Sequence, residues 1–357
     1  MAGLDLLRFL AATMVGCFHL SYWVGVKGST TYGLTKGIFS GQPGFQSGWV
    51  GVEIFFVISG FVIAYSAENV GATSFARSRF LRLWPAAAIC ASLTLLVMLW
   101  AAGSRPSEVF TTYLRSVFFV PFPPWIDGVY WTLGVEIAFY GLVWLLLRLG
   151  RFGWIDGLAC VLALTSTSLW LAAPMAPLIA KGLHHRFGEL LLLTHGCEFA
   201  CGILLWLVLF KRAEPRRLIF LALALLGGVL EILDEASVKI PGPPMNAFAA
   251  ILLWLGAVAL LTASVVHRSL VDRWLTGLAK LIRLMGLGTY PLYLVHNSIG
   301  AVIMGRLAAM GVEKGYCGPI ALAVAMLIAG AVTLWLEPPV LRLLRTLMGD
   351  DRRIVRA

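Results

Sequence analysis

Long apolar runs separated by short polar connections dominate the pattern of the chain. A helix needs about 20 mostly apolar residues to cross the hydrocarbon core of a bilayer. The stretches near that length are residues 4–26, 49–67, 83–103, 129–149, 155–173, 196–211, 217–233, 246–266, 286–309 and 317–341. The pattern therefore predicts an all-α, polytopic integral membrane protein with about ten transmembrane helices.

The basic residues predict how these helices are oriented. Short cytoplasmic connections of membrane proteins carry an excess of Lys and Arg. With the N-terminus inside, most of the 28 Lys and Arg residues fall on the inner connections, so we expect both termini in the cytoplasm. Residues 1–345 are then a single membrane domain, and residues 346–357 are a short basic cytoplasmic tail.

Composition agrees with this class and excludes others. The chain is 59% hydrophobic and 13% charged, and its mean hydropathy of +0.86 is too high for a soluble, disordered or fibrous protein. The net charge of +10 follows from the basic inner connections, so we expect no nucleic-acid partner. All six cysteines lie in or at the edges of the apolar stretches, and we interpret them as packing residues that hold neither a disulfide nor a metal.

Four ionisable residues lie well inside the apolar stretches, each on a different one. They are His19, Glu53, Glu136 and His296, and their positions place them in one layer at or just outside the membrane centre. An ionisable group at that depth is costly and is by default a functional candidate. A His beside a carboxylate suits general-base catalysis; the alternative is that each group makes a polar contact between helices.

Five further ionisable residues favour simpler explanations. Glu198 and Glu231 lie nearer the ends of their stretches, where we expect them to reach toward water. His184, His185 and His195 fall on an outer connection, where we expect solvated loop histidines; contact with an acceptor or an incidental metal site is the alternative.

A cluster of arginines, Arg77, Arg79 and Arg82, directly follows the second apolar stretch. Guanidinium groups bind phosphates through paired hydrogen bonds, so the cluster could hold a phosphorylated coenzyme at the inner surface. A positive patch that contacts only lipid headgroups is the alternative.

Several motifs resemble those of acyltransferase family 3, whose ten-span membrane members acylate envelope and secreted glycans. In chain order they are Arg8 with His19, residues 48–61 (GWVGVEIFFVISGF), 79–85 (RFLRLWP), 130–140 (YWTLGVEIAFY), 289–296 (TYPLYLVH) and 337–339 (EPP). The sequence departs from the usual pattern at Thr132, where Ser is common, and at Asn297 and Ser298, where many members have an aromatic residue and Pro. The resemblance covers nearly the whole chain and is greatest to the branch that acetylates bacterial exopolysaccharide.

The resemblance implies an O-acetyltransferase of the bacterial inner membrane. Acetyl-CoA would be the donor, a polysaccharide or lipid-linked oligosaccharide the acceptor, and no metal would be needed. His19 would take the proton of the sugar hydroxyl, with Glu53 or Glu136 orienting its ring; a covalent acetyl-His intermediate stays open. A backbone amide, Ser59 or His296 would stabilise the oxyanion. A proton-coupled transporter or flippase is the alternative function.

The expected site residues fall into three groups. The catalytic group is His19, Glu53 and Glu136; the donor-binding group is Arg8, Arg77, Arg79, Arg82 and Ser59; the acceptor-binding group is Tyr130, Trp131, Tyr290, Tyr293 and His296. Arg8 lies about 16 Å inward of His19 along one helix, so we expect it to touch the coenzyme.

Overall fold

The fold of the described residues is entirely helical. The structure is a computed structural model, and it describes residues 1–41, 44–101, 103, 105–239 and 247–349. No strand occurs in these ranges, which confirms the predicted all-α class. The last eight residues of the predicted tail, 350–357, lie outside the described residues.

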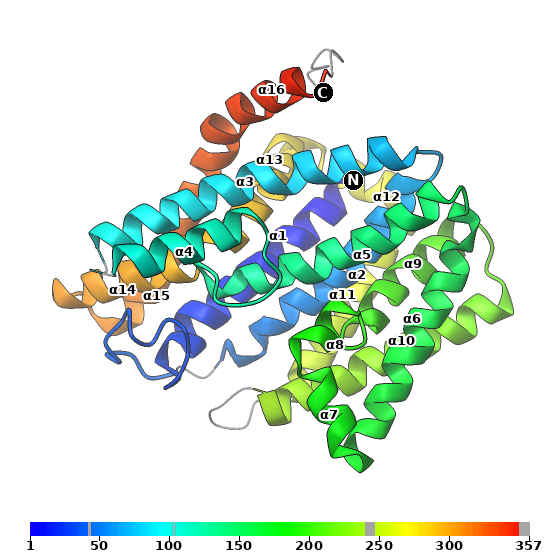
Figure 1. The fold of residues 1–357 in the computed structure, drawn as a ribbon, viewed down its shortest axis with the longest axis horizontal. Helices are drawn as coiled ribbons and strands as arrows, with labels where there is room; N and C mark the ends of the chain where they lie inside the picture. Colours follow the sequence, from blue (N-terminus) through cyan, green and yellow to red (C-terminus); the bar gives the residue numbers. More distant parts are fainter. Residues whose placement is uncertain (42–43, 102, 104, 240–246, 350–357) are drawn as a thin grey trace.

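Sixteen α-helices follow one another along the described part of the chain (Figure 1). They are α1 (Ala2–Cys17), α2 (Gly51–Ala67), α3 (Ala72–Trp100), α4 (Pro106–Val117), α5 (Trp131–Arg148), α6 (Ile155–Ala172), α7 (Pro177–Leu183), α8 (Arg186–Leu190), α9 (Gly196–Phe210), α10 (Pro215–Asp234), α11 (Ala247–Val266), α12 (Arg268–Trp274), α13 (Ala279–Val295), α14 (Ser298–Ala309), α15 (Lys314–Ala331) and α16 (Glu337–Leu347). In Figure 1, α12 and α16 lie on the same side of the molecule as the N-terminus.

Among the residues that the structure describes, seven helical segments are long and apolar enough to cross a membrane, or eight if α13 and α14, bent by 70° at their junction, form one broken span. Each of the ten predicted stretches falls on helix in the described residues. The count differs because α9 has only 15 residues and α10 has charged residues at both ends. The prediction of a membrane protein is confirmed, whereas ten spans and cytoplasmic termini stay predictions.

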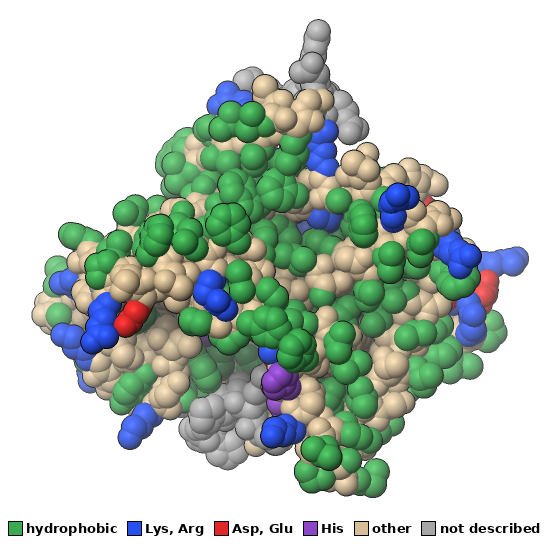
Figure 2. Space-filling view, in the orientation of Figure 1, with side chains coloured by type: hydrophobic (Ala, Val, Ile, Leu, Met, Phe, Trp, Pro, Cys, Tyr) green, Lys and Arg blue, Asp and Glu red, His purple; other side chains and the backbone are tan. Residues whose placement is uncertain are grey.

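The surface of the molecule is that of a protein solvated by lipid. Large apolar side chains such as Trp100, Leu178 and Leu327 are more than 70% exposed, which a soluble domain avoids over large areas. Figure 2 shows apolar side chains over most of one face, with Lys and Arg mainly toward its margins.

Helices α2 and α9 approach one another so closely that their backbones touch. A Cβ atom on Gly60 would lie 2.3 Å from the carbonyl oxygen of Phe199, and one on Gly202 would lie 2.0 Å from that of Val57. Close approach through small residues is a common way for membrane helices to associate. Because α2 carries several candidate site residues, this contact fixes where they stand relative to α9.

We predict that Gly202→Ala destabilises the protein by about 1–3 kcal/mol, because its methyl group must push the two backbones apart. Thermal unfolding of the purified protein in detergent measures the effect. The matched control is Gly256→Ala on α11, where a new Cβ meets nothing within 4 Å. Equal melting temperatures for the two variants would contradict the tight α2–α9 contact.

Candidate active site with two cavities and a histidine pair

Two histidines from opposite ends of the chain meet inside the bundle. Nδ1 of His19 lies 2.8 Å from Nε2 of His296. His19 lies in a π-helical turn, Phe18–Tyr22, that continues α1, and His296 lies at the break between α13 and α14. Such irregularities in a helix often occur at functional sites, and here two of them place imidazole rings in contact.

The hydrogen bonds determine which nitrogen of each ring carries a proton. Nδ1 of His296 lies 3.1 Å from the carbonyl oxygen of Leu292, which can only accept, so this nitrogen is the donor. In a neutral ring, Nε2 of His296 is then an acceptor, and Nδ1 of His19 donates to it. This arrangement leaves Nε2 of His19 with its lone pair, as a general base requires.

Asp127 holds the bent segment that carries His296. Its carboxylate accepts hydrogen bonds from the side-chain amide of Asn297 and the backbone N–H of Ser298, both at 2.7 Å, and from the backbone N–H of Val129 at 3.2 Å. The side chain is 1% exposed. Since α14 begins at Ser298, the carboxylate caps this helix from another part of the chain.

Three of the candidate donor-binding arginines line one cavity. Arg8 on α1 and Arg79 and Arg82 on α3 surround a volume of about 110 Å³, which we call the arginine cavity. The guanidinium carbon of Arg82 lies 6.0 Å from the ring centre of Tyr290, another residue of the lining. Arg77, on the same helix, is not among the described residues that line it.

Glu136 belongs to this cavity rather than to the histidine pair. Its carboxylate accepts hydrogen bonds from Ser59 Oγ at 3.2 Å and from the hydroxyl of Tyr140. All three residues line the arginine cavity together with Thr132 and Tyr290. Glu136 is therefore placed to fix polar groups beside the arginines.

His19 opens onto a second, larger cavity of about 820 Å³, which we call the histidine cavity. Its lining includes Glu53, Asp127 and Trp131. Val52 and Tyr293 line both cavities, and the ring of Tyr293 lies 5.8 Å from that of His296. The two cavities are thus separated by a wall that these two side chains share.

Of the remaining expected site residues, two line the histidine cavity and one packs beside it. Glu53 shares the histidine cavity with His19, but its ion pair, at 3.4 Å, is with His195. Tyr130 is 2% exposed and donates its hydroxyl to the carbonyl of Ala87 on α3, so it supports the fold beside the site. Trp131 lines the histidine cavity, as expected for a residue that contacts the acceptor.

The structure corrects three expectations about ionisable residues. Glu198 and Glu231 do not reach toward water, and His195 is not a solvated loop residue, because all three are fully buried. Nδ1 of His195 lies 2.5 Å from Glu231 Oε1. The reason is that α9 begins directly after His195 in the interior of the bundle, beside α2 and α10.

Sequence reasoning missed Asp127 and the cluster around His195. Asp127 lies in a polar connection, so nothing in the hydropathy pattern distinguishes it. The spacing of His195 and Glu198, three residues apart at the start of a helix, was a usable signal because such residues share a helix face.

Comparisons with known proteins place the chain in a family. Residues 1–336 match the acyltransferase 3 family, described as an acyltransferase domain. A curated relative, nodulation protein 10 of Rhizobium leguminosarum bv. viciae, is 30% identical over 195 residues, which are 47% of this chain and 50% of the relative. The chain thus matches about half the length of that protein. No solved structure matches. Since the family match extends over nearly the whole chain, the protein belongs to acyltransferase family 3.

Proposed function

We propose that the protein is a membrane O-acyltransferase that moves an acetyl group from acetyl-CoA to a sugar hydroxyl of an exopolysaccharide or its lipid-linked precursor. We further propose the bacterial inner membrane as its location. The observation that carries the proposal is the wall of Val52 and Tyr293, which separates a cavity lined by arginines from one that contains His19. A donor with phosphates and an acceptor with a hydroxyl would meet at such a wall.

The arginine cavity suits part of the donor rather than the whole coenzyme, because its volume of about 110 Å³ is below the range of small-molecule sites. Arg8, Arg79 and Arg82 supply the paired N–H groups that phosphates require, and all three line the same cavity. The thioester would extend from this cavity toward Tyr293. Nothing larger than the slender arm of the coenzyme needs to pass the wall.

The acceptor suits the histidine cavity, whose volume of about 820 Å³ is in the range of small-molecule sites. Nε2 of His19 takes the hydroxyl proton as the hydroxyl oxygen attacks the thioester carbonyl. The C–O bond forms, the C–S bond breaks, and the proton passes to the thiolate. His296 accepts from Nδ1 of His19 and orients the ring, the role expected of Glu53 or Glu136.

A test of the whole proposal compares the polysaccharide of the host with and without the gene by mass spectrometry. We expect one O-acetyl group per modified unit to disappear with the gene and to return on complementation. Binding of acetyl-CoA to the purified protein in detergent separates this function from a proton-coupled transporter or flippase, which has no need of the coenzyme.

We predict that His19→Ala lowers transfer roughly 10²- to 10⁴-fold, the usual contribution of a general base. Replacing its partner, as His296→Ala, should cost less, roughly 10- to 100-fold, because the base remains but is less well oriented. Transfer of labelled acetyl groups in membrane vesicles measures both. The control is His267→Ala, which changes an exposed His outside both cavities; near-normal transfer by a well-folded His19→Ala would refute the role.

We predict that the double variant Arg79→Ala with Arg82→Ala weakens acetyl-CoA binding by roughly tenfold or more, since each charge-assisted hydrogen bond contributes about 1.5–3 kcal/mol. Calorimetric titration of the purified protein gives the affinity. Arg148→Ala, at the exposed end of α5, is the matched control. Unchanged affinity in the double variant would indicate that these arginines contact only lipid headgroups.

We predict that Asp127→Asn lowers kcat roughly 10- to 100-fold with little change in the KM for acetyl-CoA. The new amide group turns a donor toward one of the two N–H groups, of Asn297 and Ser298, that the carboxylate accepts, so His296 is displaced. Kinetics in membrane vesicles separates kcat from KM. Asp156→Asn, another buried carboxylate whose partners are Arg216 and Arg217, is the control. A rise in KM with normal kcat would show that Asp127 acts on the donor instead.

A further inference from the structure

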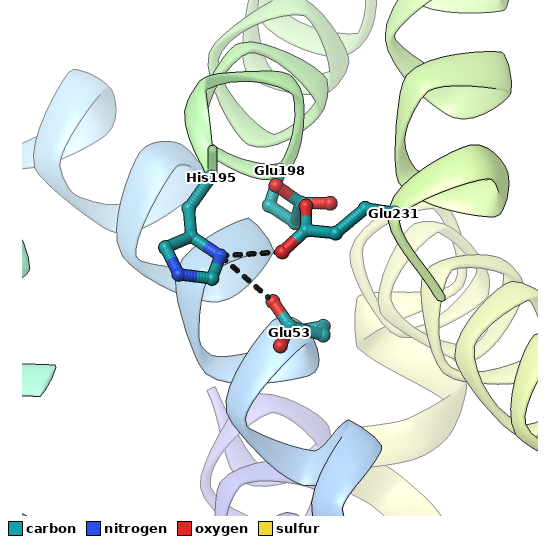
Figure 3. Close-up of side chains that lie close together, drawn as sticks. All are labelled: Glu53, His195, Glu198 and Glu231. Carbon is teal, nitrogen blue, oxygen red and sulfur yellow. Dashed lines mark ion pairs between the residues drawn. The ribbon is translucent and has the colours of Figure 1, made fainter. Parts of the chain in front are cut away.

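A second cluster of ionisable side chains lies beside the histidine cavity and has no part in the proposed reaction. It consists of Glu53 on α2, His195 and Glu198 at the start of α9, and Glu231 on α10 (Figure 3). One ligand atom from each residue lies within 4.8 Å of every other, and each residue is at most 2% exposed. Figure 3 shows that the four side chains converge from three helices.

From this geometry we propose that the cluster is a binding site for one divalent transition-metal ion. Imidazole nitrogen and carboxylate oxygens are ligands of Zn²⁺, Mn²⁺ and Fe²⁺. In di-iron and di-manganese bundle proteins, a Glu and a His three residues later on one helix bind metal together with carboxylates from facing helices. His195 and Glu198 have this spacing in the opposite order, with His195 directly before the first residue of α9, and Glu53 and Glu231 lie on neighbouring helices.

The distances between the ligand atoms lie near those of a metal site, although not all in the same direction. Nδ1 of His195 lies 2.5 Å from Glu231 Oε1 and 3.4 Å from Glu53 Oε2. Ligand atoms of a tetrahedral zinc site lie about 3.4 Å apart, given bonds of about 2.0–2.1 Å. To bind an ion, the His195–Glu231 pair must open by about 0.9 Å, and the pairs that lie up to 4.8 Å apart must close by up to about 1.4 Å.

Charge supports a cation in this place. With all three carboxyl groups ionised, the four groups carry net negative charge even if the imidazole is protonated, and burial makes such a charge costly, so either protons or a cation must offset it. A divalent ion bound to a neutral imidazole offsets two of the three negative charges without adding a proton. The acyl transfer proposed above consumes and releases no net proton, so it does not require the cluster to store one.

The surroundings are built to hold the carboxylates in place. Cys197 lies with its Sγ 3.1 and 3.0 Å from the two oxygens of Glu198, to which the thiol donates. Side chains that hydrogen-bond to metal ligands in this way orient them and raise affinity. A Cβ on Gly228 of α10 would lie 3.1 Å from Glu198 Oε1, so glycine lets α10 come close enough for Glu231 to reach His195. Glu53 also lines the histidine cavity, which gives an ion a route of entry.

Metal analysis of the purified protein tests the site. The protein is prepared with a tag that contains no histidine, dialysed against Zn²⁺ and then against buffer, and analysed by mass spectrometry of the elements. We expect roughly one zinc per chain in the wild type and at least a tenfold loss in His195→Gln and Glu231→Gln, since each removes a ligand. Asp156→Asn, a buried carboxylate outside the cluster, is the matched control and should keep its zinc.

Two measurements on folded protein cover the case in which a ligand variant does not fold. A chelator should lower the melting temperature of the wild type, and added Zn²⁺ should restore it. Cys197→Ala keeps all four ligands and should bind Zn²⁺ roughly 10- to 100-fold more weakly. Wild-type protein with no zinc and a melting temperature insensitive to chelator would overturn the proposal, as would equal zinc in wild type and Glu231→Gln. The result is independent of acyl transfer, so its failure leaves the proposed function standing.

Discussion

Inside a bilayer, every polar group that a helix break exposes must find its partner within the protein, because lipid supplies none. Breaks and ionisable residues therefore occur together in this structure. The junction of α13 and α14 frees the backbone N–H of Ser298, and Asp127 accepts it. The same junction presents His296 to His19, which itself lies in a π-helical turn. The irregular backbone and the candidate catalytic groups stabilise one another, and neither would be tolerated at this depth alone.

Helix α2 contributes residues to both cavities and to the cluster around His195. Along one helix, Val52 contributes to the wall between the two cavities, Glu53 faces the histidine cavity and the His195 cluster, and Ser59 binds Glu136 in the arginine cavity. Its close contact with α9 through Gly60 and Gly202 fixes these positions against the helix that carries Glu198. A shift of α2 would thus disturb all three polar regions together.

Hydropathy alone predicted the class of fold and the helices, because apolar length is a local property of the sequence. The depth of residues in their spans also identified His19 and His296 correctly as members of one layer, although not as direct partners. Pairings between spans could not be predicted, because they depend on how helices pack. Glu53 was expected beside His19 and pairs with His195, and Glu198, near the end of its apolar stretch, is buried because α10 covers it. The distance of a residue from the end of its span indicates its depth in the membrane. It does not show whether the side chain faces water or the interior of the bundle.

The wall of Val52 and Tyr293 gives the proposed reaction its direction. In the proposed reaction, phosphates held by Arg8, Arg79 and Arg82 would not follow the acyl group into the histidine cavity, because they would give up charge-assisted hydrogen bonds in an apolar interior. The coenzyme would therefore stay on its own side, and only the thioester carbon would have to come within reach of the hydroxyl. His19 lies on the acceptor side of this wall, in the histidine cavity, so in the proposed reaction the acyl group would have to reach past Val52 and Tyr293 while the phosphates stay behind.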